Sequence, residues 1–97
     1  MKPSKEVAAA VWRIVVKPSA ARELALLGSK PDRQRLVDLI ATLAFNPRPQ
    51  GCEKLSGQIG LYRVRSGNFR VVYEIVDDLL LVSVIKVGHR KSIYRKL

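Results

Sequence analysis

The sequence predicts an α+β fold in which a two-helix hairpin packs on one face of a mainly antiparallel four-stranded sheet, in the order β-α-α-β-β-β. Three observations predict this class: a strand-like run near the start, an apolar stripe at helical spacing, and three strand-like runs joined by tight turns. The 97 residues suffice for one domain, which we expect to span residues 1–97. Residues 1–10 precede the first pattern and are expected to be loosely ordered.

The first strand and the first helix are predicted from residue types. Residues 11–17 (VWRIVVK) are rich in β-branched and aromatic side chains, which favour a strand, and Pro18 should end it. Ser19 is expected to cap a short helix that runs to residue 27 and ends at Gly28.

The second helix is predicted from its periodicity. It should begin near Pro31 and Asp32, because proline is tolerated in the first turn and an acidic residue favours the positive end of the helix. Pro47 should end it. The helix has one apolar stripe at i, i+3, i+4 and i+7 spacing, formed by Leu36, Leu39, Ile40 and Leu43.

The second half of the chain indicates three further strands after a loop over residues 46–60. These strands are residues 61–66 (LYRVRS), 69–76 (FRVVYEIV) and 79–87 (LLLVSVIKV). Gly67 and Asn68 suit a two-residue hairpin turn, and Asp77 and Asp78 indicate a second turn. The last strand is apolar on both faces and should therefore lie inside the sheet.

The charge of the chain points to an anionic partner. There are 18 Lys and Arg against 8 Asp and Glu, a net charge of +10, which favours a phosphate backbone or an acidic protein as partner. Cys52 is the single cysteine, so the fold does not depend on a disulfide, which fits a cytoplasmic location. No apolar run approaches the roughly 20 residues that cross a bilayer, so we expect no membrane association.

Strand alternation gathers arginines on one side of the predicted sheet. Arg63 and Arg65 should point away from the face that carries Tyr62, and the two-residue turn should set Arg65 opposite Arg70. Like charges opposite each other destabilise a sheet, so the cluster suggests a bound anion such as phosphate, whose geometry matches guanidinium. The alternative is a solvated charged face.

The end of the chain should bring further groups to this cluster. We expect His89, Arg90 and Tyr94 to arrive beside the arginines, where cations hold phosphate, tyrosine stacks on a base and histidine moves a proton. The sequence offers no cluster of carboxylates for a metal and no cofactor motif. Cleavage there would have to be metal-free, by attack of a ribose 2′-OH on its own phosphate, and therefore specific for RNA.

Two segments, EKLSGQIGLYRVRSGNFRVVYEI and VIKVGHRKSIYRKL, resemble the RelE/ParE superfamily of bacterial and archaeal toxins, and more closely its RelE branch. The similarity covers roughly residues 11–97. It implies the toxin of a type II toxin–antitoxin system, an endoribonuclease that cleaves mRNA in the ribosomal A site, with contacts to 16S rRNA, and so stops translation. It also implies a RelB-like antitoxin that wraps and blocks the toxin, and promoter DNA bound only through that complex.

The resemblance carries roles onto particular residues. Arg63 and Arg65 match two basic strand positions that are often lysine in the family, and Arg70 matches an arginine that contacts phosphate. Arg90 matches an arginine that stabilises charge or protonates the leaving oxygen, and Tyr94 a tyrosine that stacks on a base. Since arginine stays protonated, we hypothesise that His89 is the general base, with a pKa lowered by the surrounding positive charge.

Two other functions share these features. One is a ParE-like inhibitor of DNA gyrase, which has the same fold without the RNA-cleaving residues. The other is a non-catalytic RNA-binding module in which the same cations dock RNA. The presence of Arg70, Arg90 and Tyr94 together with His89 favours the endoribonuclease.

Overall fold

The computed structural model describes residues 11–57, 59–91 and 93. Its elements follow the chain in this order: β1 (Arg13–Val16), α1 (Pro18–Ala25), α2 (Lys30–Thr42), β2 (Glu53–Lys54), β3 (Leu61–Ser66), β4 (Phe69–Val76), a 3-10 turn (Asp77–Leu79) and β5 (Leu81–His89). The α+β class predicted from the sequence is confirmed. The described residues form two α-helices, α1 and α2, and neither is long and apolar enough to cross a membrane.

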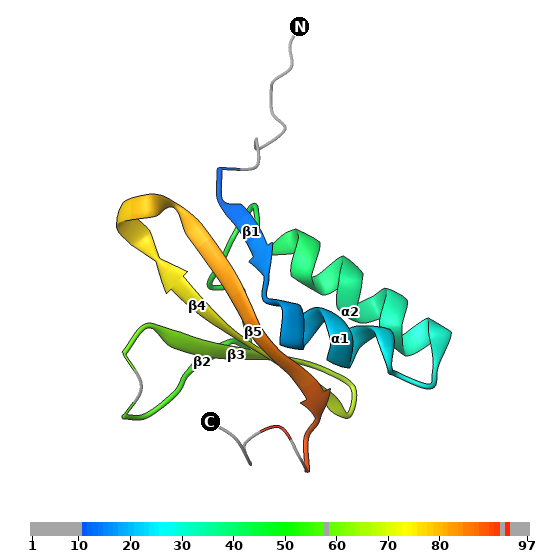
Figure 1. The fold of residues 1–97 in the computed structure, drawn as a ribbon. Coiled ribbons are helices and arrows are strands. Elements are labelled where there is room, and N and C mark those ends of the chain that lie inside the picture. The colour runs from blue at the N-terminus through cyan, green and yellow to red at the C-terminus, as the bar shows by residue number, and fades with distance from the viewer. Residues whose placement is uncertain (1–10, 58, 92, 94–97) are drawn as a thin grey trace, which may run out of the picture.

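The sheet has five strands in the order β1-β5-β4-β3-β2 (Figure 1). All neighbouring pairs are antiparallel except β1 and β5, which are parallel. The predicted number of four strands is wrong by one, because β2 lies inside the expected loop. Two exposed charged residues give no alternating apolar signal, so this strand has no pattern to detect. The inner position predicted for the last strand is confirmed.

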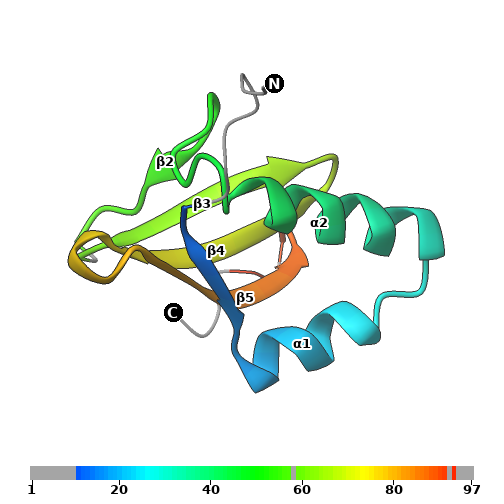
Figure 2. The same ribbon diagram turned by 90° about the horizontal axis from the view of Figure 1, so that it is seen from above.

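The two helices lie on the same face of the sheet (Figure 2). Pro18 occupies the first turn of α1 and Lys17 its N-cap position, so the prediction that Ser19 caps this helix is wrong. Proline with its fixed φ begins the helix directly after β1. The second helix begins one residue before the predicted Pro31, with the Ser29 hydroxyl accepting a hydrogen bond from the backbone N–H of Asp32 at 3.3 Å.

The core lies between the helices and the sheet. Its members are apolar side chains from α1, α2 and the three long strands: Ala20, Leu36, Ile40, Leu43, Val64, Val71, Tyr73, Ile75, Val82, Val84 and Val87. In β5 the core positions pass from Val84 to Val87 rather than alternating, because a β-bulge leaves Ile85 as an extra residue opposite β4. The bulge therefore reverses which residues of β5 face the helices beyond Val84.

A second buried region lies on the other face of the sheet. Val72 alternates with the core residues Val71 and Tyr73, so its side chain leaves β4 on the face opposite the helices, yet it is fully buried. Ile93 is also fully buried outside the main core. After β5 the chain turns away from the helices (Figure 1), and the backbone N–H of Arg90 donates to the Asn68 carbonyl at 2.8 Å. The Arg90 backbone therefore lies beside the hairpin turn between β3 and β4.

Candidate nucleic-acid interface

The face of the sheet opposite the helices carries three of the six candidate residues, Arg63, Arg65 and Arg70, and is called the arginine face below. Arg65 pairs directly with Arg70 across β3 and β4, as the two-residue turn predicts. Gly67 has φ 58° in this turn, a conformation that glycine adopts without strain. Arg63 lies two residues from Arg65 and shares its face.

Arg70 is held in place by the backbone. It is only 9% exposed, and its Nη1 donates hydrogen bonds to the carbonyl oxygens of Gly67 at 3.3 Å and Phe69 at 3.1 Å. A buried charge is costly unless it is hydrogen-bonded, and these carbonyls reduce the cost. The planar guanidinium is thus fixed beside the hairpin turn in one orientation, and its forked donors match the oxygens of a phosphate.

Arg63 has an acidic neighbour that the sequence patterns did not indicate. Glu53 of β2 pairs with Arg63 of β3, and Nη2 of Arg63 donates to Oε1 of Glu53. Because paired residues of neighbouring strands lie on the same side, Glu53 belongs to the arginine face. Sequence reasoning missed this residue because it missed β2.

His89 and Arg90 are adjacent in sequence but differ in orientation. Arg70 pairs with Gly88, whereas His89 pairs with Phe69, and the His89 and Phe69 rings meet edge to face at 5.9 Å. Phe69 packs against the main core, so the imidazole lies on the helix side of the sheet, beside the rim of that core. Arg90 is exposed, with its backbone bonded to the hairpin turn. The strand end lies beside the arginines as expected, while the imidazole faces the opposite way.

A hydrogen bond to His89 selects the tautomer that a neutral imidazole adopts here. The backbone N–H of Lys91 donates to Nδ1 of His89 at 3.2 Å, so the neutral ring carries its proton on Nε2. That tautomer donates at Nε2 rather than accepting there. Tyr94, the sixth candidate, lies outside the described residues.

A carboxylate on α1 positions β5 before it reaches His89. The pairing of β1 with β5 ends at Val84, and beyond it the backbone N–H of Val87 donates to Oε1 of Glu23 at 2.9 Å. The other oxygen of Glu23 accepts from Nζ of Lys86 at 3.0 Å. Beyond the end of β1, the Glu23 carboxylate thus supplies the acceptor that a neighbouring strand would otherwise give to the backbone of β5.

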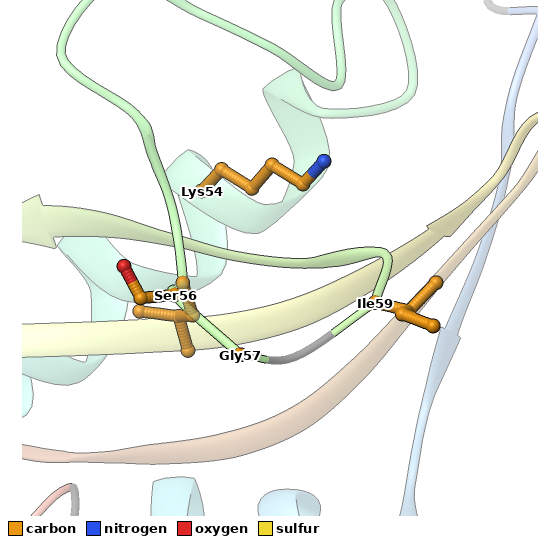
Figure 3. Close-up of a pocket in the computed structure, with 5 residues that line it drawn as sticks. Lys54, Ser56, Gly57 and Ile59 are labelled. Carbon is orange, nitrogen blue, oxygen red and sulfur yellow. The ribbon is translucent and has the colours of Figure 1, made fainter.

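The described residues also include a pocket outside the candidate site. A pocket of about 390 Å³ lies at the loop between β2 and β3, lined by Lys54, Leu55, Ser56, Gly57 and Ile59 (Figure 3). It contains none of the six candidate residues. Within residues 11–57, 59–91 and 93, no three His, Cys, Asp or Glu side chains gather as ligands for a metal ion.

Comparison with known proteins gives consistent similarities. A family model described as the ParE toxin of the type II toxin–antitoxin system parDE matches residues 9–94. The mRNA interferase toxin RelE of Escherichia coli strain K12 is 34% identical over 74 residues, which are 74% of this chain and 76% of that protein. Toxin RelE of Mycobacterium tuberculosis is 30% identical over 84 residues, 87% of each chain.

The fold is also similar to that of solved structures. In the crystal structure of the archaeal RelE–RelB complex from Pyrococcus horikoshii, one chain superposes with a TM-score of 0.73 and 25% identity. The match covers 82% of this chain and 96% of that chain.

Proposed function

This chain belongs to the RelE/ParE superfamily of type II toxin–antitoxin toxins, and from that premise we propose that it is a ribosome-dependent endoribonuclease. The proposed substrate is mRNA in the ribosomal A site, where cleavage stops translation. The related proteins named mRNA interferase RelE support an endoribonuclease activity. The proposal places the protein in the cytoplasm, where it contacts the 16S rRNA around the A site.

The pairing of Arg65 with Arg70 is the observation that carries the proposal. Two cations opposite each other in a sheet repel, and Arg70 is in addition mostly buried. A bound phosphate would remove the repulsion and accept hydrogen bonds from both guanidinium groups. A phosphate of the RNA backbone between these two side chains would therefore be held by charge and by hydrogen bonds.

The proposed chemistry needs no metal ion. The ribose 2′-oxygen loses its proton and attacks the adjacent phosphorus, and the bond from phosphorus to the 5′-oxygen breaks. The products are a 2′,3′-cyclic phosphate and a 5′-OH, once the leaving oxygen takes up a proton. Arg65 and Arg70 would stabilise the charge on the phosphate, Arg90 would act at the leaving oxygen, and Tyr94 would stack on a base.

We also propose a RelB-like antitoxin as the partner. The similar P. horikoshii structure is a complex of RelE with RelB. The net charge of +10 would attract an acidic chain, which would cover the arginine face or displace the residues that follow β5. Promoter DNA would be bound only through that complex.

Primer extension on mRNA in a purified translation reaction tests the proposal. Wild type, Arg70→Ala and a control, Arg22→Ala, are compared; Arg22 is exposed on α1, on the helix side of the sheet. Wild type and the control should cut within A-site codons, and Arg70→Ala should not. Absence of cuts with folded wild-type protein would contradict the proposal.

A second candidate is inhibition of DNA gyrase, because the matching family model is described as a ParE toxin. A supercoiling assay with purified gyrase separates the two: inhibition by wild type without mRNA cleavage favours the second. Binding of RNA without either activity would indicate the non-catalytic module.

A further inference from the structure

We propose that Glu53 is the general base that takes the proton from the ribose 2′-OH. This inference rests on the proposed endoribonuclease function and supplies a proton acceptor, a role that the arginines cannot fill. Arginine stays protonated at any pH in which the protein folds, so neither Arg63 nor Arg65 can accept a proton. A carboxylate is ionised at neutral pH and can.

The register of the sheet selects Glu53 among the carboxylates of the strands. Glu53 and Glu74 are the acidic residues of the described strands, and both lie on the arginine face. Glu53 lies in the cross-strand row of Arg63 and Val72, which is next to the row of Arg65 and Arg70. Successive rows on one face are about 7 Å apart, so Glu74, which is two rows from Arg65, lies farther from Arg65 than Glu53 does.

Two other titratable groups fit this role less well. His89 emerges on the helix side of the sheet, and its Nδ1 already accepts the Lys91 N–H. Lys86 pairs with Val72 on the arginine face, but its ammonium is bonded to Glu23 at 3.0 Å. That ion pair turns the Lys86 ammonium toward α1 and away from the arginines.

Arg63 gives Glu53 its orientation without closing it to substrate. One carboxylate oxygen, Oε1, accepts the hydrogen bond from Arg63, and the Glu53 side chain is 59% exposed. Because β2 is an edge strand, the described charged residues on the strand beside Glu53 are Arg63 opposite and Arg65 two residues along. The ribose beside a phosphate held by Arg65 and Arg70 would meet Glu53 one row along the sheet.

The step balances as follows. The 2′-OH proton passes to a carboxylate oxygen of Glu53 while the 2′-oxygen forms a bond to phosphorus. The bond from phosphorus to the 5′-oxygen breaks with its electron pair, and that oxygen takes one proton from water. Glu53 then returns its proton to solvent, so the protein is unchanged at the end.

The test is single-turnover cleavage of mRNA on stalled ribosome complexes as a function of pH. Wild type, Glu53→Gln, Glu53→Asp and the control Glu74→Gln are compared, with Arg70→Ala as the check of the site itself. Glu53→Gln should lower the rate constant by about 100-fold or more, the range for loss of a general base. It should also abolish the acidic limb, in which the wild-type rate rises with pH.

The controls separate catalysis from folding and binding. Glu53→Asp retains a carboxylate and should keep the acidic limb at a reduced rate, and Glu74→Gln should behave as wild type. Glu53→Gln removes a negative charge beside phosphate, so its affinity for RNA should be unchanged or higher. Thermal unfolding of each variant checks the fold.

Two results would overturn the inference: one leaves the proposed function standing, and the other removes it as well. If Glu53→Gln cleaves at the wild-type rate, or keeps the acidic limb, while Arg70→Ala is inactive, Glu53 is not the base and the proposed function stands. If folded wild type does not cleave, the proposed function fails and Glu53 as its base fails with it.

Discussion

Arg48 donates hydrogen bonds from its two terminal nitrogens to the two carboxylate oxygens of Asp77, at 3.1 and 3.0 Å. Its Nε donates to the Tyr62 hydroxyl at 3.2 Å. The ion pair ties the loop after α2 to the turn between β4 and β5, two segments 29 residues apart in the chain. It lies on surface segments away from the arginine face and so concerns stability rather than RNA.

The ion pair predicts a pH-dependent stability. The Arg48 guanidinium holds the pKa of Asp77 below its usual range. The stabilising contribution is therefore present above the unfolded-state pKa of about 4 and is lost as the pH falls through the lower folded-state pKa. Asp77→Asn should unfold at a lower temperature than wild type at pH 7, and the difference should shrink as the pH falls below about 4. The neighbouring Asp78→Asn, measured in parallel, should show no such convergence.

The buried hydrogen bond of Tyr73 should contribute measurably to the free energy of unfolding. The Tyr73 hydroxyl is buried and donates to the Pro47 carbonyl at 2.7 Å, and burial raises its pKa. Tyr73→Phe should lower the free energy of unfolding by about 1–2 kcal/mol at pH 7, measured by urea denaturation. Above about pH 10 the unfolded tyrosine ionises while the buried one does not, so wild type should lose stability relative to the variant as the pH rises. A constant difference up to pH 11 would contradict this explanation.

Replacing Arg65 with an uncharged residue should change the stability of the fold and its affinity for RNA in opposite directions. Arg65 is exposed and faces Arg70, so Arg65→Gln should raise the free energy of unfolding by about 0.3 kcal/mol by removing a like-charge pair. The same change should weaken binding of RNA with a 2′-deoxy nucleotide at the cleavage position. It should also reduce the slope of log affinity against log salt by about 1. The control, Arg22→Gln, should leave that slope unchanged.

Removing the Glu23 carboxylate should reduce the protection of the β5 backbone against hydrogen exchange. Glu23→Ala leaves the Val87 N–H without its acceptor and Lys86 without its partner, which should cost about 1–3 kcal/mol. Glu23→Gln keeps an acceptor oxygen and should cost less. Hydrogen exchange read at the Val87 amide should speed up in the alanine variant and far less in the glutamine variant. Equal exchange in both would show that the N–H has another partner.

The sequence predicted the parts of the fold that have a local pattern. The stripe of Leu36, Ile40 and Leu43 marked α2, and the turn at Gly67 and Asn68 set the β3–β4 register, so the pairing of Arg65 with Arg70 could be predicted. The short strand β2 has no periodicity, because both of its residues are charged and exposed. The partner of Arg63 was therefore unpredictable.

The face of His89 depends on a feature that alternation cannot reveal. Counting by twos from the core residues Val82 and Val84 places residue 89 on the arginine face. The bulge at Ile85 adds one residue, so Val87 and His89 emerge on the helix side instead. A bulge in a run that is largely apolar on both faces leaves no mark in the sequence. The role of His89 as base remains a prediction that His89→Ala would test in the cleavage assay.

The parallel pairing of β1 with β5 joins the earliest strand of the fold to the last one synthesised. A growing chain emerges from the ribosome N-terminus first, so β1 waits for its partner until residues 81–84 are free. Gly88, which pairs with Arg70, and Arg90 emerge later still. The residues that surround Arg70 therefore come from two stretches of the chain, and the later stretch follows the β1 partner residues 81–84 in the order of synthesis.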